Sequence, residues 1–207
     1  MNILVYGDSM SWGIIPESRQ RQPFAKRWTG VLQQALGNSY RVIEECLNGR
    51  TTQFDDPSRL ARNGLSTINM ILETHAPIDL VIVMLGINDF QDVIGATARD
   101  SVKGLRKLVA QIQSFKPESM QVPAAVMVII PPEIQKPRSI MSAKFSGYAR
   151  AEHSEKEYIA ALADLSVSTV LSSAVIGLSK VDGIHLDEAD HLTLGRHIAL
   201  QLSKQQR

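Results

Sequence analysis

The stretch VYGDSMSWG, residues 5–13, joins an apolar run to a turn. The run ILVY, residues 3–6, is typical of a short buried strand. Gly7 allows a tight exit from that strand, which a residue with a Cβ would resist. Ser9 is therefore expected at the carboxyl end of a strand, where open α/β sheets place ligands. The same residue types also form ordinary turns and helix caps, so the stretch alone leaves both interpretations open.

Apolar runs alternate with amphipathic stretches along the rest of the chain. This order predicts an α/β fold, in which helices cover both faces of a parallel sheet. The runs at 79–85 and 124–130 are almost wholly apolar, as expected for strands buried on both sides. Asp56 and Pro57 are expected to open the second helix as its cap and first-turn proline. The predicted strands are 2–6, 41–45, 79–85, 124–130 and a weaker one near 167–171; the predicted helices lie near 25–36, 58–75, 97–115, 147–164 and 189–204.

The composition favours a single domain covering residues 1–207. The net charge is only +1, from 22 basic and 21 acidic residues, which gives no reason to expect a nucleic acid or a membrane as partner. Cys46 is the only cysteine, so no internal disulfide can form. Because the first strand begins at Asn2 and no apolar run approaches bilayer length, we expect a cytoplasmic protein without a signal peptide.

Two segments have less regular character. The basic residues of 19–27 (Arg19, Arg21, Lys26 and Arg27) are expected to be solvated. Residues 131–146, PPEIQKPRSIMSAKFS, contain three prolines and directly follow the fourth predicted strand. This segment is either a flap over a pocket or a long surface loop.

Four short segments share one expected edge of the sheet or can fold back to it: residues 7–9 (GDS), 48–50 (NGR), 86–89 (GIND) and 182–185 (DGIH). Together they supply a hydroxyl, hydrogen-bond donors, a carboxylate and an imidazole. Acyl transfer needs this set, because a hydroxyl attacks only when a base takes its proton. A carboxylate orients that base, and donors stabilise the oxyanion that develops.

With these four segments in this order, the chain resembles the SGNH, or GDSL, hydrolase superfamily over nearly its whole length. The resemblance is closest to the small bacterial arylesterase and acyltransferase group. It implies a flavodoxin-like three-layer α/β/α sandwich with a parallel five-stranded sheet. The stretches that support this comparison are RWTGVL (27–32), VIEECLNGRTT (42–52), DDP (55–57), LVIVMLGINDF (80–90) and DGIHL (182–186).

The resemblance also implies a role for each site residue. Ser9 would be the nucleophile, His185 the general base and then the acid, and Asp182 the carboxylate that orients His185. The backbone N–H groups of Ser9 and Gly49, with the Asn88 side-chain amide, would form the oxyanion hole. Asp187 and Asp190 compete with Asp182 by position, but only Asp182 lies in an Asp-x-x-His arrangement with His185.

Further residues near these segments have two possible roles. Met10, Trp12 and Ile184 are candidates for the substrate pocket, with core packing an equal alternative for Trp12. Met10 stands where relatives usually have Leu, and Ser11 where close relatives often have Thr. Asp8 and Asp89 are expected to hold neighbouring loops together.

Metal and cofactor sites are not predicted. The run of His185, Asp187, Glu188, Asp190 and His191 lacks the His-Glu-x-x-His spacing and is better explained as a charged start of a helix. His191 and His197 are expected to be surface or packing residues of that helix. No Gly-rich phosphate loop or dinucleotide fingerprint occurs, which argues against a nucleotide or flavin despite the expected layout.

The resemblance implies a serine esterase that cleaves short acyl or aryl esters through an acyl-enzyme. Its partners would be a small ester substrate and an acyl acceptor, either water or another alcohol, and the group often forms homo-oligomers. Alternatives in the same superfamily are a thioesterase, a lysophospholipase and a carbohydrate deacetylase. A non-catalytic binding protein with the same fold is disfavoured by the complete set of Ser9, Asp182, His185 and Asn88.

Overall fold

The computed structural model describes residues 1–204 and contains the predicted five-stranded sheet. The strands are β1 (Asn2–Gly7), β2 (Arg41–Cys46), β3 (Leu80–Met84), β4 (Ala125–Ile130) and β5 (Ser168–Leu171). They pair in the order β2-β1-β3-β4-β5, and every pairing is parallel. The carboxyl ends of all strands therefore meet at one edge, as the sequence predicted. Residues 205–207 of the expected single domain lie outside the described residues.

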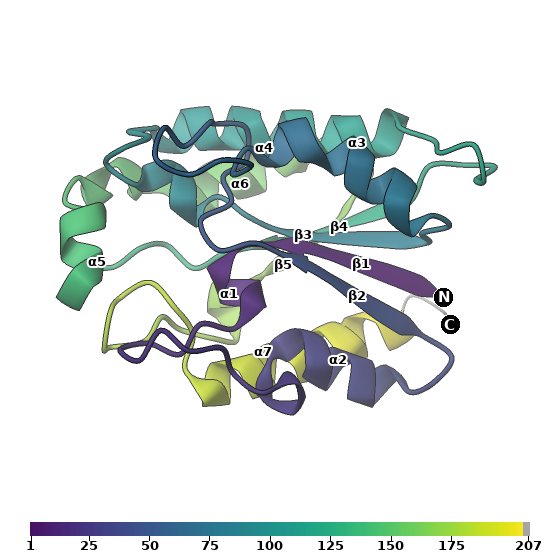
Figure 1. The fold of residues 1–207 in the computed structure, drawn as a ribbon, viewed down its shortest axis with the longest axis horizontal. Helices are drawn as coiled ribbons and strands as arrows, with labels where there is room; N and C mark the ends of the chain where they lie inside the picture. Colours follow the sequence, from purple (N-terminus) through teal and green to yellow (C-terminus); the bar gives the residue numbers. More distant parts are fainter. Residues whose placement is uncertain (205–207) are drawn as a thin grey trace.

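Helices cover both faces of the sheet, which confirms the three-layer α/β/α fold (Figure 1). On one face lie α1 (Ser9–Trp12), α2 (Trp28–Leu36) and α7 (Glu188–Lys204). On the other lie α3 (Gly64–His75), α4 (Ala98–Ser114) and α6 (Ser154–Leu162). The side chains of β1 alternate between the layers: Ile3 and Val5 pack in the core with α2 and α7, whereas Leu4 and Tyr6 pack in the core with α3 and α4.

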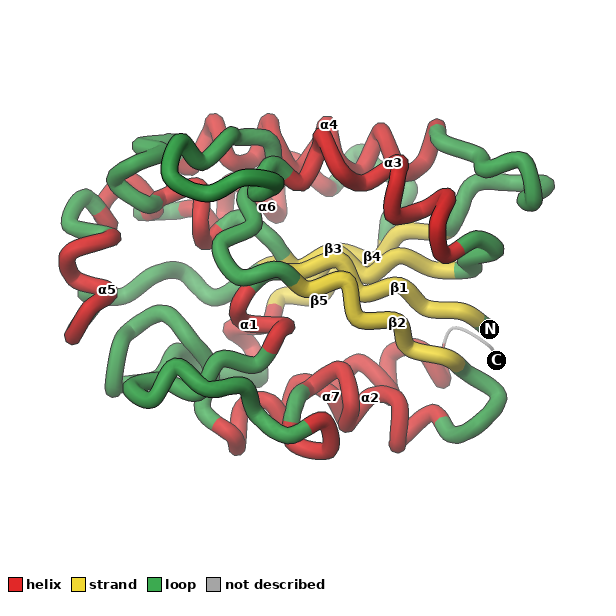
Figure 2. Tube along the Cα trace, in the orientation of Figure 1, coloured by secondary structure: helices red, strands yellow, loops and turns green. Residues whose placement is uncertain are grey.

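Short elements complete the chain between these layers. Four 3-10 turns are η1 (Phe24–Lys26), η2 (Ile87–Phe90), η3 (Tyr148–Ala151) and η4 (Ser172–Ala174). The helix α5 (Ser139–Lys144) lies within the predicted flap segment and stands beyond the carboxyl ends of the strands (Figure 1). Figure 2 shows that loops gather at this same end of the molecule, opposite the amino terminus.

The start of α3 differs from the prediction. The helix begins at Gly64, and its cap is Asn63, whose side chain accepts a hydrogen bond from the N–H of Ser66. Asp56 does not cap a helix, because its carboxylate accepts from both the N–H and the hydroxyl of Ser58 in a local turn. An Asp-Pro pair favours a turn as readily as a helix start, and here the turn prevails. The predicted helix 147–164 is likewise divided into η3 and α6.

The basic segment 19–27 is not uniformly solvated, so that expectation was wrong. Arg27 is buried, and its Nη2 lies 2.9 Å from Oε2 of Glu44, which also pairs with Arg21 at 3.1 Å. Arg21 and Lys26 are exposed as expected, and Lys26 forms an exposed ion pair with Glu188. A guanidinium at the edge of a core keeps its charge when a carboxylate partners it, which sequence composition does not show.

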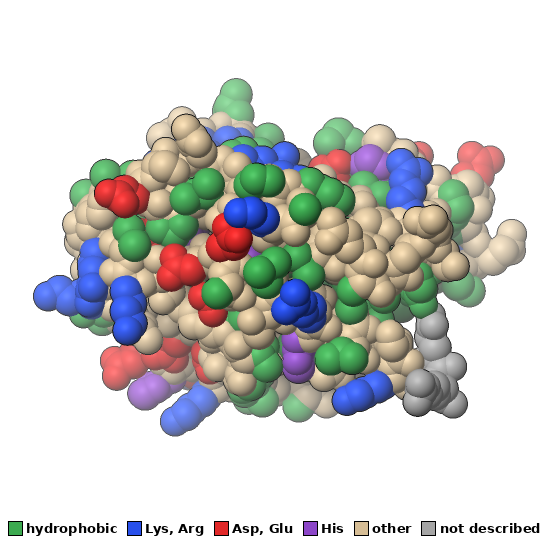
Figure 3. Space-filling model, turned by 90° about the horizontal axis from the view of Figure 1, so that it is seen from below, with side chains coloured by type: hydrophobic (Ala, Val, Ile, Leu, Met, Phe, Trp, Pro, Cys, Tyr) green, Lys and Arg blue, Asp and Glu red, His purple; other side chains and the backbone are tan. Residues whose placement is uncertain are grey.

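The outer surface has mixed character. Figure 3, which views the face covered by α2 and α7, shows acidic, basic and hydrophobic side chains interspersed. None of the helices within residues 1–204 combines the length and the apolar character needed to cross a membrane.

Candidate active site

Ser9 lies at the amino end of α1, directly after β1. Asp8 caps this four-residue helix by accepting a hydrogen bond from the N–H of Met10 at 2.9 Å. Gly13 ends it with φ of 85°, a left-handed conformation that favours glycine. The helix is thus one turn between two sharp bends, and it fixes the Ser9 hydroxyl at the edge of the sheet.

His185 and Asp182 meet Ser9 at this edge. The His185 Nε2 atom lies 3.0 Å from Ser9 Oγ, and its Nδ1 lies 2.6 Å from Asp182 Oδ2. An ionised carboxylate only accepts hydrogen bonds, so the ring proton belongs on Nδ1 and the lone pair of Nε2 faces the hydroxyl. The structure therefore joins the three residues of the predicted triad in one chain of hydrogen bonds.

Asp182 is held in its ionised form by its own loop. Its Oδ1 accepts from the N–H groups of Ile184 and His185, both at 3.0 Å. Burial raises the pKa of this carboxyl, but the His185 hydrogen bond and charge, with these N–H groups, outweigh burial and lower the pKa below its usual value. The loop thus presents a buried negative charge to the imidazole at one fixed position.

Two backbone donors stand free beside the hydroxyl. Gly49 follows β2 with φ of 84°, and it lines the same cavity as Ser9. Within residues 1–204, neither the N–H of Ser9 nor that of Gly49 has a hydrogen-bond acceptor. Unsatisfied N–H groups at a helix start and a tight turn suit a developing oxyanion.

Asn88 also lines the cavity, but its amide is already engaged. Its Nδ2 donates to Asp8 Oδ2 at 2.9 Å and to the carbonyl oxygen of Arg50 at 3.1 Å, and its Oδ1 accepts from Gln91 Nε2 at 2.6 Å. An oxyanion contacting Asn88 would share one of these amide hydrogens. The Arg50 carbonyl is the weaker competitor, because the other partner is a carboxylate.

The buried carboxylates Asp8 and Asp89 hold these loops together. Burial raises the pKa of Asp8 to about 7 and that of Asp89 to about 6, against the lowering effect of their hydrogen bonds. Asp89 accepts from the N–H and hydroxyl of Thr52, at 2.8 and 2.7 Å, and from the hydroxyl of Ser101. These hydrogen bonds connect the loop after β2 to the turn after β3. They therefore also fix the position of Gly49 relative to Asn88.

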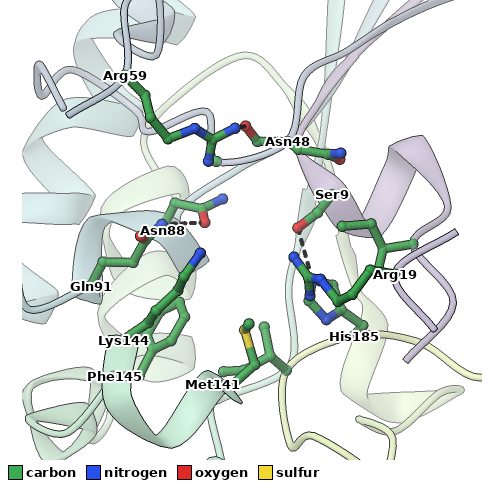
Figure 4. A pocket seen from close by; sticks show the side chains of 13 residues that line it. Ser9, Arg19, Asn48, Arg59, Asn88, Gln91, Met141, Lys144, Phe145 and His185 are labelled. Carbon is green, nitrogen blue, oxygen red and sulfur yellow. Dashed lines mark hydrogen bonds between the residues drawn. The ribbon is translucent and has the colours of Figure 1, made fainter. Parts of the chain in front are cut away.

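The cavity in front of Ser9 has a volume of about 30 Å³. Figure 4 shows Ser9, Arg19 and His185 on one side of it and Asn88, Gln91, Lys144 and Phe145 on the other. Of the predicted pocket residues, Ile184 lines the cavity. Met10 is instead packed in the core, and the Trp12 ring lies 4.9 Å from the Arg21 guanidinium; neither is among the described residues that line the cavity.

Several lining residues were not singled out from the sequence: Ile14, Arg19, Asn48, Arg59, Gln91, Met141, Lys144 and Phe145. The position of the flap segment was a usable signal, since α5 and the residue after it supply Met141, Lys144 and Phe145. The place of Arg59 in the cavity was not recognised, because the sequence analysis assigned this residue to a helix at 58–75. Gln91 could have been inferred from its place three residues after Asn88.

The remaining histidines and acids do not join this arrangement. His191 is fully buried between α7 and α2, where its Nδ1 accepts from the N–H of Trp28 at 3.4 Å. Asp190 lies at the start of α7, and its carboxylate accepts a hydrogen bond from the N–H of Gly177. In the part of the chain that the structure describes, no three His, Cys, Asp or Glu side chains are grouped as metal ligands.

Comparison with known proteins gives one family and many similar structures. The sequence model of the GDSL-like lipase/acylhydrolase family matches residues 5–190. The structure is similar to Est24, a carbohydrate acetylesterase from Sinorhizobium meliloti, with 33% identity, a TM-score of 0.92 and 98% of each chain covered. It is similar to an inhibitor-bound aryl esterase from M. smegmatis, with 35% identity, a TM-score of 0.92 and 98% of each chain covered. A search of curated proteins gives no match.

Proposed function

The chain belongs to the GDSL-like lipase/acylhydrolase family, and from this premise we propose that it is a serine esterase acting on short acyl esters. The observation that supports this most directly is the pair of hydrogen-bond distances, 3.0 Å from Ser9 Oγ to His185 Nε2 and 2.6 Å from His185 Nδ1 to Asp182 Oδ2. A hydroxyl, a base and an orienting carboxylate at these distances form an activated nucleophile.

In the proposed first step, Ser9 Oγ attacks the ester carbonyl carbon while its proton passes to His185 Nε2. Asp182 stabilises the imidazolium that forms and keeps the ring in place. The carbonyl oxygen becomes an oxyanion, and the N–H groups of Ser9 and Gly49 donate to it, with Asn88 as a third donor. These donors are fixed before the reaction, so they lower the barrier without reorganisation.

In the second step, the tetrahedral intermediate collapses and its C–O bond to the alcohol breaks. His185 Nε2 returns its proton to the leaving oxygen, and the acyl group remains on Ser9 as an ester. Water then attacks this acyl-enzyme with His185 again as base, and the free acid leaves. Another alcohol could take the place of water at this step, which would make the protein an acyltransferase.

The size of the cavity favours a small acyl group. The cavity volume of about 30 Å³ is small, so a short acyl group fits where a long chain would require side chains to move. Similarity to a carbohydrate acetylesterase supports acetyl as the acyl group, and similarity to an aryl esterase supports aryl esters as substrates. Carbohydrate deacetylation is therefore the second candidate function.

Hydrolysis of para-nitrophenyl esters of increasing acyl length tests the proposal. We expect the acetate to be cleaved with the highest kcat/KM and activity to fall as the chain lengthens. Absence of hydrolysis with every chain length would contradict the proposed function. The homo-oligomer that the family resemblance implies stays a prediction, which light scattering would test.

A further inference from the structure

The cavity at Ser9 is lined by three basic side chains and by no acidic one among the described residues. Arg19 comes from the loop after α1, Arg59 from the loop before α3, and Lys144 from the last position of α5. They enter from three directions: in Figure 4 Arg19 lies on the Ser9 side, Lys144 on the opposite side and Arg59 above. Three separate segments of the chain thus bring positive charge to the reacting hydroxyl.

Several basic side chains of the protein are held in ion pairs. Arg21 and Arg27 pair with Glu44, Arg106 with Asp164 and Arg150 with Asp92. Within residues 1–204, no carboxylate lies in ion-pair distance of Arg19, Arg59 or Lys144. Positive charge that no ion pair neutralises therefore lines this cavity.

Arg19 has a donor that the protein leaves unsatisfied. Its Nη1 atom is buried and has no hydrogen-bond partner among the described residues. The backbone at Arg19 has φ of 61°, which is unusual for a residue with a side chain, and its N–H donates to the Ile15 carbonyl at 3.0 Å. A buried guanidinium nitrogen without a partner is costly, and an acceptor entering the cavity would satisfy it.

The three charges are close enough to act on one another. The pKa of Lys144 is lowered. Burial is the largest cause, and the positive charges of Arg19 and Arg59 act in the same direction. Asp56 is the one carboxylate that opposes this effect, and its oxygen already accepts from Ser58. A negative group placed among the cations would relieve their mutual repulsion.

The positions of Arg59 and Lys144 also fit the path of a substrate. Arg59 is held by a 2.6 Å hydrogen bond to the Asn48 carbonyl, beside Gly49. Arg59 and Lys144 line both the small cavity at Ser9 and a larger neighbouring one of about 360 Å³. Asp56 and Asp92 also line the larger cavity, and Asp92 is already paired with Arg150. The larger part of an ester would extend between these two cations, since the cavity at Ser9 admits only a small group.

We propose that the ester cleaved at Ser9 carries a carboxylate, which Arg19, Arg59 and Lys144 bind next to the scissile bond. This inference rests on the proposed esterase function and adds the chemical class of the substrate to it. Guanidinium and ammonium groups bind carboxylates through charge-assisted hydrogen bonds, and Arg does so with two parallel donors. The carboxylate belongs either to the alcohol part or to the acyl part of the ester.

Matched substrate pairs distinguish these two sources. For the alcohol part, para-acetoxyphenylacetate is compared with its uncharged amide, in which the methylene group keeps the leaving group nearly unchanged. For the acyl part, para-nitrophenyl hydrogen glutarate is compared with para-nitrophenyl methyl glutarate. We expect kcat/KM for the charged member to exceed that for the neutral member by about tenfold in at least one pair. The preference should shrink as NaCl is raised to about 0.5 M.

Variants assign the preference to the three cations. Arg19→Gln, Arg59→Gln and Lys144→Gln, made separately, should each reduce the ratio of charged to neutral kcat/KM several-fold. Lys116→Gln, an exposed residue between α4 and β4, removes the same charge far from the site and should leave the ratio unchanged. Because the readout is a ratio within one enzyme, a general loss of folded protein does not alter it.

The outcomes separate this inference from the function on which it rests. Cleavage of the neutral esters without preference for a charged one in either pair would overturn the carboxylate inference and leave the esterase proposal standing. A preference that none of the three variants reduces would overturn it as well. Failure to cleave any ester of either pair would contradict both.

Discussion

The Ser9 hydroxyl and the His185 Nε2 atom lie 3.0 Å apart, although 176 positions separate the two residues in the chain. The parallel sheet makes this possible, because β1 ends at Gly7 beside the loop that precedes α7. At neutral pH a serine hydroxyl is a weak nucleophile, and an adjacent imidazole makes it a stronger one by accepting its proton. Their contact is what turns the edge of the sheet into a candidate catalytic centre.

The first prediction concerns the carboxylate behind the imidazole. Asp182→Asn should lower kcat by about 10⁴-fold, because an amide permits the wrong tautomer of His185. Asp187→Asn is the matched control: this exposed residue lies two positions after His185, and the variant should stay within about twofold of the wild type. Steady-state kinetics with para-nitrophenyl acetate checks both, and equal losses in the two variants would contradict the role of Asp182.

The second prediction concerns the side-chain donor of the oxyanion hole. Asn88→Ala should lower kcat by about 10²–10³-fold, the usual effect of removing one such donor. Asn69→Ala removes an amide from the half-buried face of α3, where it accepts from Gln111, and should leave kcat unchanged. A loss below about fivefold in Asn88→Ala, far short of the effect of one donor, would show that this amide only holds Asp8 and the Arg50 loop.

The third prediction compares two glycines with positive φ. Gly49 has φ of 84° and Gly37 has φ of 74°, so alanine at either position should cost at least about 1 kcal/mol of unfolding free energy. A Cβ at position 49 would also collide with the Arg59 guanidinium, whereas a Cβ at position 37 meets nothing within 4 Å. We expect both variants to be destabilised in chemical denaturation and only Gly49→Ala to lose esterase activity. Full activity of Gly49→Ala would argue against the Gly49 N–H as an oxyanion donor.

The fourth prediction follows from the buried His191. Burial lowers its pKa from 6.5 to about 4, and the charges of His185 and Arg27 act in the same direction. The unfolded chain therefore binds more protons than the folded protein between these pH values, so stability is present above pH 6.5 and lost as the pH falls towards 4. The full effect is about 3 kcal/mol of unfolding free energy.

Chemical denaturation at several pH values tests this effect when the pH dependence of the unfolding free energy is compared between the wild type and two histidine variants. The loss of unfolding free energy on acidification should be smaller in His191→Gln than in the wild type. His153→Asn changes an exposed histidine and should retain the wild-type loss. Asp8 and Asp89 contribute with the opposite sign, since their raised pKa values favour the folded state at low pH, but they do so equally in all three proteins. An unchanged loss in His191→Gln would contradict the account.

The sheet and most helices could be predicted because local pattern determines them. The almost wholly apolar runs that became β3 and β4 have no other stable place than a covered parallel sheet. The start of α3 could not be predicted, because Asp56 and Pro57 carry the same signal for a turn as for a helix. The burial of Arg27 was also hidden, since its partner Glu44 lies on a strand that only the tertiary fold brings close.

The reactive residues of the candidate site could be inferred because they occur in short segments of distinctive composition. Ser9, Asp182 and His185 were found in this way, and the structure brings them together. The cations of the cavity could not be inferred, because Arg59 and Lys144 occur in a loop and at a helix end, and Arg19 belongs to a basic segment that was expected to be solvated. A lone basic residue looks the same in sequence whether it faces solvent or a substrate.

The engagement of Asn88 could not be read from sequence either. The family resemblance implied that the Asn88 amide donates to an oxyanion, and the structure shows its hydrogens donating to Asp8 and to the Arg50 carbonyl. Hydrogen-bond partners of a side chain depend on which loops meet at the edge of the sheet, and that is a property of the assembled fold.

Ser9 is the residue that becomes acylated in the proposed mechanism, and covalent labelling identifies that residue. The protein is treated with a fluorophosphonate, digested, and its peptides are identified by mass spectrometry. We predict a single adduct on Ser9, absent in Ser9→Ala and formed far more slowly in His185→Ala, while Ser114→Ala, an exposed serine of α4, labels as the wild type does. An adduct on another residue, or ester hydrolysis that persists in a folded Ser9→Ala protein, would contradict the account.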